Sequence, residues 1–323
     1  MLHLLKTIFK SGKFSFGFAV IVAVLLFITI YPMFDKRDPL IMGGGLYEKP
    51  NLKEYLQRNK ESAGKSSSQA AQEDQETTDL LASWGIVAVT RDTGPIQLHI
   101  LGTDNFGRDM MTQLVAGTKT SLIIGLIAGS IATLIGLTIG LLAGYLGGQL
   151  DNFLSSITNI FIVIPSFVIL VLVAVSVSSS GFMVTGVIIG LTSWPWTARS
   201  VRAQTTSLRN RDHVNLSKLS GHSMPRIIVR DILPYIASYV VMAFILQVAS
   251  GILAEASISM LGLGPRNVAT LGLMMHWAGS FNAIFNGNWW AFFPMVVMIS
   301  LITFSLNLMN SGLDQIFNPQ IRS

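Results

Sequence analysis

The stretch NFLSSITNIFIVIPSFVILVLVAVSVSSSGFMVTGVIIGLTSWPWTA, residues 152–198, contains no Asp, Glu, Lys, Arg or His. An ordinary soluble domain carries about 25% charged residues, and it could not cover its surface with an uncharged run of this length. A membrane-spanning helix needs about 20 apolar residues to cross a hydrocarbon core of about 30 Å. We therefore predict two spans here, at 153–177 and 183–203, separated by the polar break SSSG at 178–181. Pro165 and Pro195 are expected to kink them.

The rest of the chain repeats this pattern. Of its 323 residues, 50% are apolar and only 12% are charged. Further apolar runs predict spans at 14–34, 120–145, 232–254 and 289–313, which makes six helices in all. The first run is too long for a signal peptide and is predicted to be an uncleaved anchor. This composition excludes a soluble enzyme, a disordered chain and a nucleic-acid-binding protein, and it predicts an all-α polytopic membrane protein. The absence of cysteine excludes disulfides and thiolate metal sites.

Basic residues gather on one side of the predicted membrane. The region between the fourth and fifth spans carries Arg199, Arg202, Arg209, Arg211, Lys218, Arg226 and Arg230, and further lysines precede the first span. The positive-inside rule places this side in the cytoplasm, together with both chain termini. Residues 35–117 then form an extracytoplasmic insertion, whose Ser- and Gln-rich middle is too polar to fold alone. The sequence pI near 9.5 is thus a topology signal and does not point to nucleic acid.

The predicted spans are almost free of ionisable groups, which argues against a carrier with its own proton relay. Glu255 is the one carboxylate within an apolar run, and it lies about 31 Å along a helix from Pro234, near the outer surface. We predict that Glu255, with Ser259 and Met260, faces a solute pathway or forms its outer gate. The alternatives for Glu255 are a structural hydrogen bond and an exposed carboxylate at the membrane interface. Energy for transport would come from another subunit.

Glycines mark several predicted structural features. In LGTDNFGRD, residues 101–109, glycine allows unusual dihedral angles and aspartate caps the next helix. The residues predicted to be structural there are Gly102, Thr103, Asp104, Gly107, Arg108 and Asp109. Short strands are expected before them, at 84–89 and 96–101. Gly262 and Gly264 are predicted to end the fifth span. Close helix packing, rather than a pore lining, is predicted for the small-residue stripe Gly125, Gly129, Gly136, Gly140 and Gly144.

The sequence contains no catalytic or metal-binding constellation. The tripeptide GKS at 64–66 lacks the earlier glycine of a phosphate-binding loop. The segment MMH at 274–276 has no neighbouring ligand that would complete a copper site. We therefore expect no enzyme activity, no metal and no cofactor in this chain.

Residues 211–234, RDHVNLSKLSGHSMPRIIVRDILP, predict two short amphipathic helices rimmed by basic residues. Gly221 is placed to end the first helix in a left-handed conformation, Ser223 to begin the second, and Pro234 to lead into the fifth span. The residues alone leave two interpretations open. The loop lies on anionic lipid, or it is a knob that docks into a cytoplasmic protein.

The same loop resembles the EAA loop of ABC importer permeases. In that pattern three residues separate Glu-Ala-Ala from a Gly, and the Pro of a Leu-Pro pair comes thirteen residues after this Gly. Gly221 and Pro234 keep this spacing, whereas Asn215, Leu216 and Ser217 replace Glu-Ala-Ala. Four other segments are similar to the C-type permease of dipeptide and oligopeptide importers: 101–109, 140–151, 252–264 and 312–322.

This resemblance implies an ABC type I importer permease fold. Residues 1–34 would be the N-terminus and first span, 35–117 the insertion, and 118–323 the core with a coupling loop at 205–234. Its implied partners are a homologous second permease, two ATPase subunits that hold ATP and Mg²⁺, and an external solute-binding protein, in the bacterial inner membrane. The implied ATPase-coupling residues are Asn215, Leu216, Ser217, Lys218, Leu219, Gly221, Met224, Arg226, Leu233 and Pro234.

The substrates that the resemblance implies are peptides. Nickel chelates, oligosaccharides and glutathione-like solutes are alternatives within the same family, and a secondary carrier or a membrane-assembly scaffold is the alternative outside it. Because Asn215 stands where the family has Glu, a further hypothesis is that the ATPases couple less strongly to this subunit than to its partner permease.

Overall fold

The computed structural model describes residues 9, 11–53, 55–56, 98–176 and 181–317. Within these ranges the regular elements are helices, and an isolated antiparallel bridge joins Thr103 to Asp109. The strand predicted at 84–89 lies outside the described residues, as do the polar middle of the insertion and the GKS tripeptide. The strand predicted at 96–101 is wrong where it is described, because residues 100–101 form a turn.

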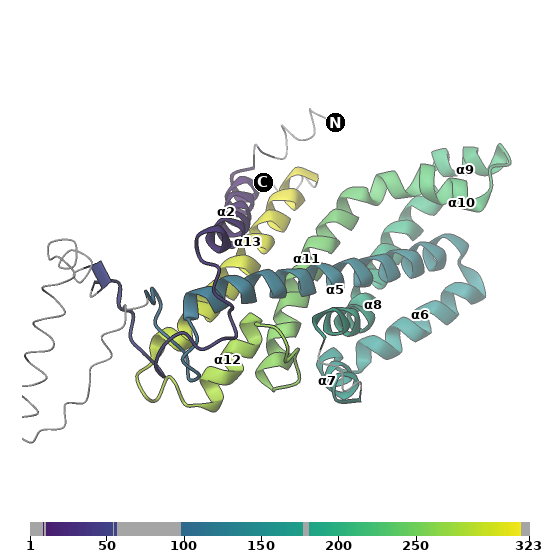
Figure 1. Ribbon diagram of the computed structural model, residues 1–323. Helices are drawn as coiled ribbons and strands as arrows, with labels where there is room; N and C mark the ends of the chain where they lie inside the picture. The colour runs from purple at the N-terminus through teal and green to yellow at the C-terminus, as the bar shows by residue number, and fades with distance from the viewer. Residues whose placement is uncertain (1–8, 10, 54, 57–97, 177–180, 318–323) are drawn as a thin grey trace, which may run out of the picture.

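The helices form an elongated bundle (Figure 1). In chain order they are α2 (Gly12–Phe34), α5 (Met110–Leu146), α6 (Gly148–Val163), α7 (Ser166–Ser176), α8 (Phe182–Arg209), α9 (Asp212–Leu219), α10 (Met224–Ile227), a π-helix (Ile228–Ile232), α11 (Leu233–Met260), α12 (Leu271–Ser280), a 3₁₀ turn (Trp289–Ala291) and α13 (Phe293–Phe317).

Four helices in the described ranges are long and apolar enough to cross a membrane: α2, α5, the continuous Met224–Met260 helix, and α13. The pair α6 and α7 makes a fifth span if it is counted as one, bent by 84° at its break. The break falls at Ile164, whose backbone is extended. Because proline disfavours the helical conformation of the residue before it, Pro165 does more than kink the predicted third span; it interrupts it.

Helix α8 is the predicted fourth span. It has 28 residues and is about 42 Å long at 1.5 Å per residue. Its Thr, Ser and Arg residues keep it outside the group of strongly apolar helices, so the count of six spans stays a prediction. Pro195 lies inside α8, and the helix continues through it.

The helix α5 is the centre of the bundle, because its glycines let two neighbours approach closely. A Cβ added at Gly129 would lie 2.7 Å from the Val248 side chain of α11. One added at Gly140 would lie 2.7 Å from the carbonyl oxygen of Ala198 in α8. The stripe predicted for close packing is therefore confirmed, and it serves α11 with its first half and α8 with its second half.

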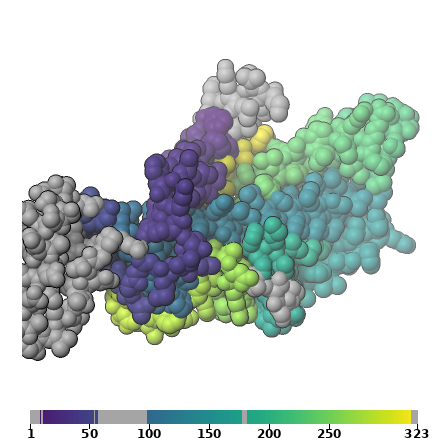
Figure 2. All heavy atoms as spheres, viewed as in Figure 1, coloured from purple at the N-terminus to yellow at the C-terminus, as the bar shows by residue number. Residues whose placement is uncertain are grey.

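The two terminal helices pack against each other. A Cβ at Gly17 of α2 would lie 2.5 Å from the carbonyl oxygen of Ser305, and one at Gly312 of α13 would lie 2.6 Å from the backbone nitrogen of Phe14. The start of α2 and the end of α13 lie at the same end of the bundle as α9 and α10 (Figure 1). Figure 2 shows α9 and α10 projecting from the body of the molecule.

Candidate functional site

The projecting tip, which we define as residues 211–227, begins with a helix that ends as its sequence predicts. Gly221 follows α9 with φ +72°. Its N–H donates to the carbonyl oxygen of Lys218 at 3.0 Å, and the N–H of His222 donates to that of Ser217 at 3.2 Å. These two bonds form a Schellman motif, in which a left-handed residue satisfies the last carbonyls of a helix. The predicted role of Gly221 is confirmed.

The tip has an anchored face and an exposed face. Val214 is fully buried and packs in one cluster with Ile227, Ile228 and Ile232. The side chains of Leu216 and Leu219, by contrast, are 64% and 85% exposed. Of the other predicted coupling residues, Asn215, Lys218, Gly221, Arg226 and Pro234 are exposed, and Ser217, Met224 and Leu233 are half-buried. The tip therefore has an exposed apolar patch, surrounded by basic residues, on the surface of the molecule.

The second short helix predicted in this loop is not separate. The helix α10 runs through the π-helix into α11 without a break, so Met224–Met260 is one continuous element. Ser223 precedes the first residue of this element and Pro225 lies in its first turn, as predicted. Pro234 lies at the start of α11, also as predicted. The Ser223 side chain makes no capping hydrogen bond.

Side chains tie α9 to three neighbouring helices. His213 Nε2 lies 3.2 Å from the carbonyl oxygen of Asp231, and the His213 ring stacks on Tyr235 with centroids 4.5 Å apart. Lys218 Nζ donates to the carbonyl oxygen of Arg209 at 2.9 Å and lies 5.6 Å from the ring of Tyr145. These contacts join α9 to α8, α5 and the start of α11. The link through His213 was not predicted, because it joins residues whose proximity only the folded loop shows.

A hollow of about 570 Å³ lies between α8, α11, α13 and the bend that joins α6 to α7, which we call the α6–α7 elbow. Its wall combines apolar side chains such as Phe161 and Ile164 with polar ones such as Gln247 and Asn307. Gln247 Nε2 donates to Thr197 Oγ1 at 2.8 Å and to the carbonyl oxygen of Ser193 at 3.0 Å, which fixes α11 to α8 beside Pro195. A volume of this size falls in the range of small-molecule sites, about 300–1,000 Å³.

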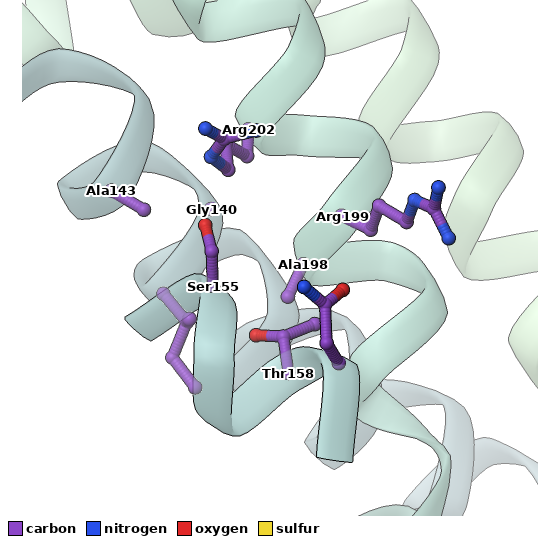
Figure 3. Close-up of a pocket in the computed structure, with 9 residues that line it drawn as sticks. Gly140, Ala143, Ser155, Thr158, Ala198, Arg199 and Arg202 are labelled. Carbon is purple, nitrogen blue, oxygen red and sulfur yellow. The ribbon is translucent and has the colours of Figure 1, made fainter. Parts of the chain in front are cut away.

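A smaller pocket of about 180 Å³ lies between α5, α6 and α8 (Figure 3). Arg202 borders this pocket and donates through Nη2 to Asp151 Oδ2 at 2.8 Å. Arg199 lines both the pocket and the hollow. In Figure 3 the two arginine side chains leave α8 in different directions, with Arg199 pointing away from Ala143 of α5.

Glu255 lies inside the helix bundle, and its role in a pathway or outer gate stays a prediction. Its side chain is fully buried and lines neither the hollow nor the smaller pocket. Ser121 Oγ donates to Glu255 Oε2 at 2.9 Å and Ser259 Oγ to Glu255 Oε1 at 2.7 Å, and Thr270 adds a third hydroxyl. The carboxyl group joins α5, α11 and α12. In this structure the alternative interpretation, a structural hydrogen bond, describes Glu255.

The helix α11 ends five residues after Glu255. The spacing from Pro234 predicts how far Glu255 lies along the helix, but not the direction in which its side chain points. Gly262, at φ +79°, ends α11 in a second Schellman motif, with the Leu263 N–H donating to Ile258 at 3.0 Å. The predicted role of Gly262 is confirmed. Met260 is 46% exposed, and its carbonyl oxygen lies 2.9 Å from His276 Nδ1.

The turn at 101–109 is built as its residue types predict. Gly102 and Gly107 have φ values of +73° and +70°. Asp104 accepts from the N–H of Arg108 at 2.9 Å and from Arg108 Nε at 2.7 Å. Asp109 caps α5 by accepting from the Thr112 N–H at 2.8 Å. The Arg108 guanidinium lies 3.9 Å from the ring centroid of Trp277, so the turn also fixes α12.

An ionic cluster next to this turn was not predicted. His99 is buried, and its Nδ1 lies 2.7 Å from Asp109 Oδ2. Arg37 Nη1 lies 3.3 Å from the same carboxylate, and Arg37 Nη2 lies 2.6 Å from Asp35 Oδ2. The hydrogen bond from Arg37 holds the pKa of Asp35 well below its usual range. Burial alone would raise the pKa of Asp109, but the His99 and Thr112 hydrogen bonds and the Arg37 charge together lower it.

Replacing Arg37 with Ala should therefore destabilise the protein in a pH-dependent way. Carboxylates whose pKa is lowered by folding stabilise the native state above their ordinary pKa of about 3.9, and this contribution is lost as the pH falls through the lowered values. Because the Arg37 side chain is 33% exposed, screening limits the loss at pH 7 to about 1 kcal/mol. Thermal unfolding in detergent should show this deficit from pH 5 to 7 and its decline below about pH 4. The control is Lys36→Ala, at the exposed neighbour; an equal loss in both variants would contradict the role of the cluster.

Comparison with known proteins identifies the family. The family model described as "Binding-protein-dependent transport system inner membrane component" matches residues 136–323. The oligopeptide transport system permease protein OppC of Mycobacterium tuberculosis is 33% identical over 228 residues, which is 70% of this chain and 77% of that protein. The dipeptide transport system permease protein DppC of Bacillus subtilis is 32% identical over 225 residues, 69% of each chain.

Among solved structures, the MetNI methionine ABC transporter in an inward-facing conformation covers 63% of this chain with a TM-score of 0.47 and 22% identity. The long apolar helices and the inner-membrane family together make this chain an integral membrane protein with a permease fold. The chain belongs to the family of binding-protein-dependent transport system inner membrane components.

Proposed function

We propose that this chain is a permease subunit of an ATP-driven peptide importer and forms one half of its translocation pathway. The observation that carries the proposal is the apolar, basic-rimmed tip of α9, held on the Gly221 and Pro234 frame, in a chain of this family. The names of the oligopeptide and dipeptide relatives favour peptides over nickel chelates and oligosaccharides.

The partners follow from this assignment. Two ATPase subunits would bind ATP and Mg²⁺ and dock on the tips of this chain and of a second, homologous permease, while an external binding protein delivers the peptide. The exposed basic residues of the tip favour a cytoplasmic location for that end of the bundle. Both chain termini would then be cytoplasmic, and the turn at 101–109 would face outward in a bacterial inner membrane.

The mechanism we propose is mechanical. Closure of the ATPases on ATP displaces α9, and the contacts of His213 and Lys218 carry this displacement into α11, α8 and α5. The hollow lies between α8, α11 and the α6–α7 elbow, so a movement of α8 or α11 changes its shape and access. The chain itself performs no chemical step in this scheme.

Reconstitution of the complete complex in liposomes tests the proposal. We expect radiolabelled dipeptide or tripeptide to accumulate only with ATP, with the binding protein present, and with ATPase subunits that can hydrolyse ATP. Accumulation driven by a proton gradient without ATP would identify a secondary carrier. Uptake of an oligosaccharide or a nickel chelate but not of peptides would favour the alternative substrates.

A further inference from the structure

Within the described residues, Arg199 is the one ionisable side chain that lines the α8 hollow. Its remaining lining consists of apolar and aromatic groups, hydroxyls, and the amides of Gln247 and Asn307. A single fixed positive charge in such a wall makes the hollow attractive to an anionic group and repulsive to a cationic one. The charge of the site is thus decided by one residue.

Arg199 has no carboxylate partner among the residues that the structure describes. The ion pairs found there bind Arg37, His99, Arg108 and Arg202, and the nearby acid Asp151 is taken by Arg202. Arg202 stands less than one turn further along α8. Two neighbouring arginines of one helix therefore differ in kind: one is neutralised by a structural carboxylate, and the other presents its charge to the hollow.

Arg199 lies within the predicted fourth span, 183–203, and ten residues before the end of α8 at Arg209. Charged side chains inside the spans of a membrane protein face water-filled cavities or bind a counter-charge, and they mark solute pathways. Arg199 is exposed in this chain and borders the hollow, so the hollow is where a counter-charge can reach it.

The residues around Arg199 suit one end of a peptide. A guanidinium group binds a carboxylate through two parallel hydrogen bonds, which gives both affinity and orientation. Trp196 precedes Arg199 by three residues, so the two side chains share a face of α8, and the Trp196 side chain is 50% exposed. A carboxylate at Arg199 would thus have an aromatic surface beside it for the adjoining apolar part of the solute.

We propose that Arg199 binds the C-terminal carboxylate of the peptide inside the membrane part of the transporter, and that this contact makes the pathway selective for solutes with a free carboxylate. The inference rests on the proposed function and adds to it the chemical group that the hollow recognises.

The test is peptide binding to the complete permease–ATPase complex without the binding protein, whose own preference would otherwise mask the effect. Radiolabelled trialanine and its C-terminal amide are compared, because they differ only in the carboxylate. We expect the wild-type complex to bind trialanine at least fivefold more tightly than the amide. Arg199→Gln should remove this preference by weakening trialanine binding alone, and Arg199→Lys should retain part of it.

Arg202→Gln is the matched control, since it removes a neighbouring charge that is already paired, and it should leave the preference unchanged. No preference in the wild type, or a preference that survives in Arg199→Gln, would overturn the inference. So would an equal loss of both ligands, which would indicate that Arg199 contacts the second permease. ATP-driven uptake is measured in parallel: if uptake of peptides occurs but is indifferent to Arg199, only this inference fails, whereas absence of peptide uptake refutes the proposed function.

Discussion

Replacing Leu219 with Asp is expected to reduce ATP-driven uptake roughly 30-fold without unfolding the protein. Leu219 is the last residue of α9, and 85% of its side chain is exposed. It makes no contribution to the buried cluster around Val214, so the fold does not depend on it. A hot-spot residue at the centre of a docking surface contributes about 2 kcal/mol to binding, which corresponds to a roughly 30-fold change in affinity.

The measurement combines two readouts: co-purification of the ATPase subunits with the permease, and uptake by the reconstituted complex. Both should fall in Leu219→Asp. The control is Leu46→Asp, which also introduces a charge at an exposed leucine, 64% exposed, but in the segment between α2 and α5. Normal uptake by Leu219→Asp would mean that the ATPases do not bind the tip.

The second large effect is expected from the smallest possible change, Gly140→Ala. The added Cβ would lie 2.7 Å from the carbonyl oxygen of Ala198, 2.7 Å from Val201 Cβ and 2.9 Å from the backbone nitrogen of Arg202. Backbone atoms on a packed helix cannot move aside individually, so α5 and α8 would have to separate. Overpacking of this kind costs about 1–3 kcal/mol, and the loss should lie at the upper end because three contacts are violated together.

Thermal unfolding of the purified complex in detergent, with the yield of assembled complex, measures this effect. Gly279→Ala in α12 is the matched control, because a Cβ there would meet nothing within 4 Å. We expect Gly279→Ala to unfold at the wild-type temperature and Gly140→Ala to unfold well below it. Equal behaviour of the two variants would show that α5 and α8 do not depend on this close approach.

Local features of the fold could be predicted from the sequence where one residue type decides the conformation. Gly221 and Gly262 end helices because a left-handed backbone favours glycine. Asp109 caps α5 because its short carboxylate reaches the free N–H groups of the first turn. The glycine spacing along α5 gave the packing face, although not which neighbour each glycine would meet.

Features that depend on contacts between distant segments could not be predicted. The side-chain direction of Glu255 depends on its hydrogen bond with Ser121, which is 134 residues away in sequence. No local sequence pattern around Arg37 or His99 predicts that both side chains contact Asp109. The charge of the hollow could not be predicted either. In the sequence Arg199 is one of seven basic residues between the fourth and fifth spans. The structure shows that Arg202 pairs with Asp151, whereas Arg199 lines the hollow.

The continuous Met224–Met260 helix has a mechanical consequence. Its Met260 end is held by the hydroxyl groups around Glu255, and its other end carries the tip. If Glu255 acts as a fulcrum, the arm from there to Met224 is about 46 Å long and the arm to Met260 about 7 Å. The helix is then a lever of unequal arms, with a ratio of about six. In the proposed transporter, a swing of several ångströms at the Met224 end would shift the Met260 end by only about 1 Å. Such a lever would move the inner half of the pathway and leave the outer mouth nearly still.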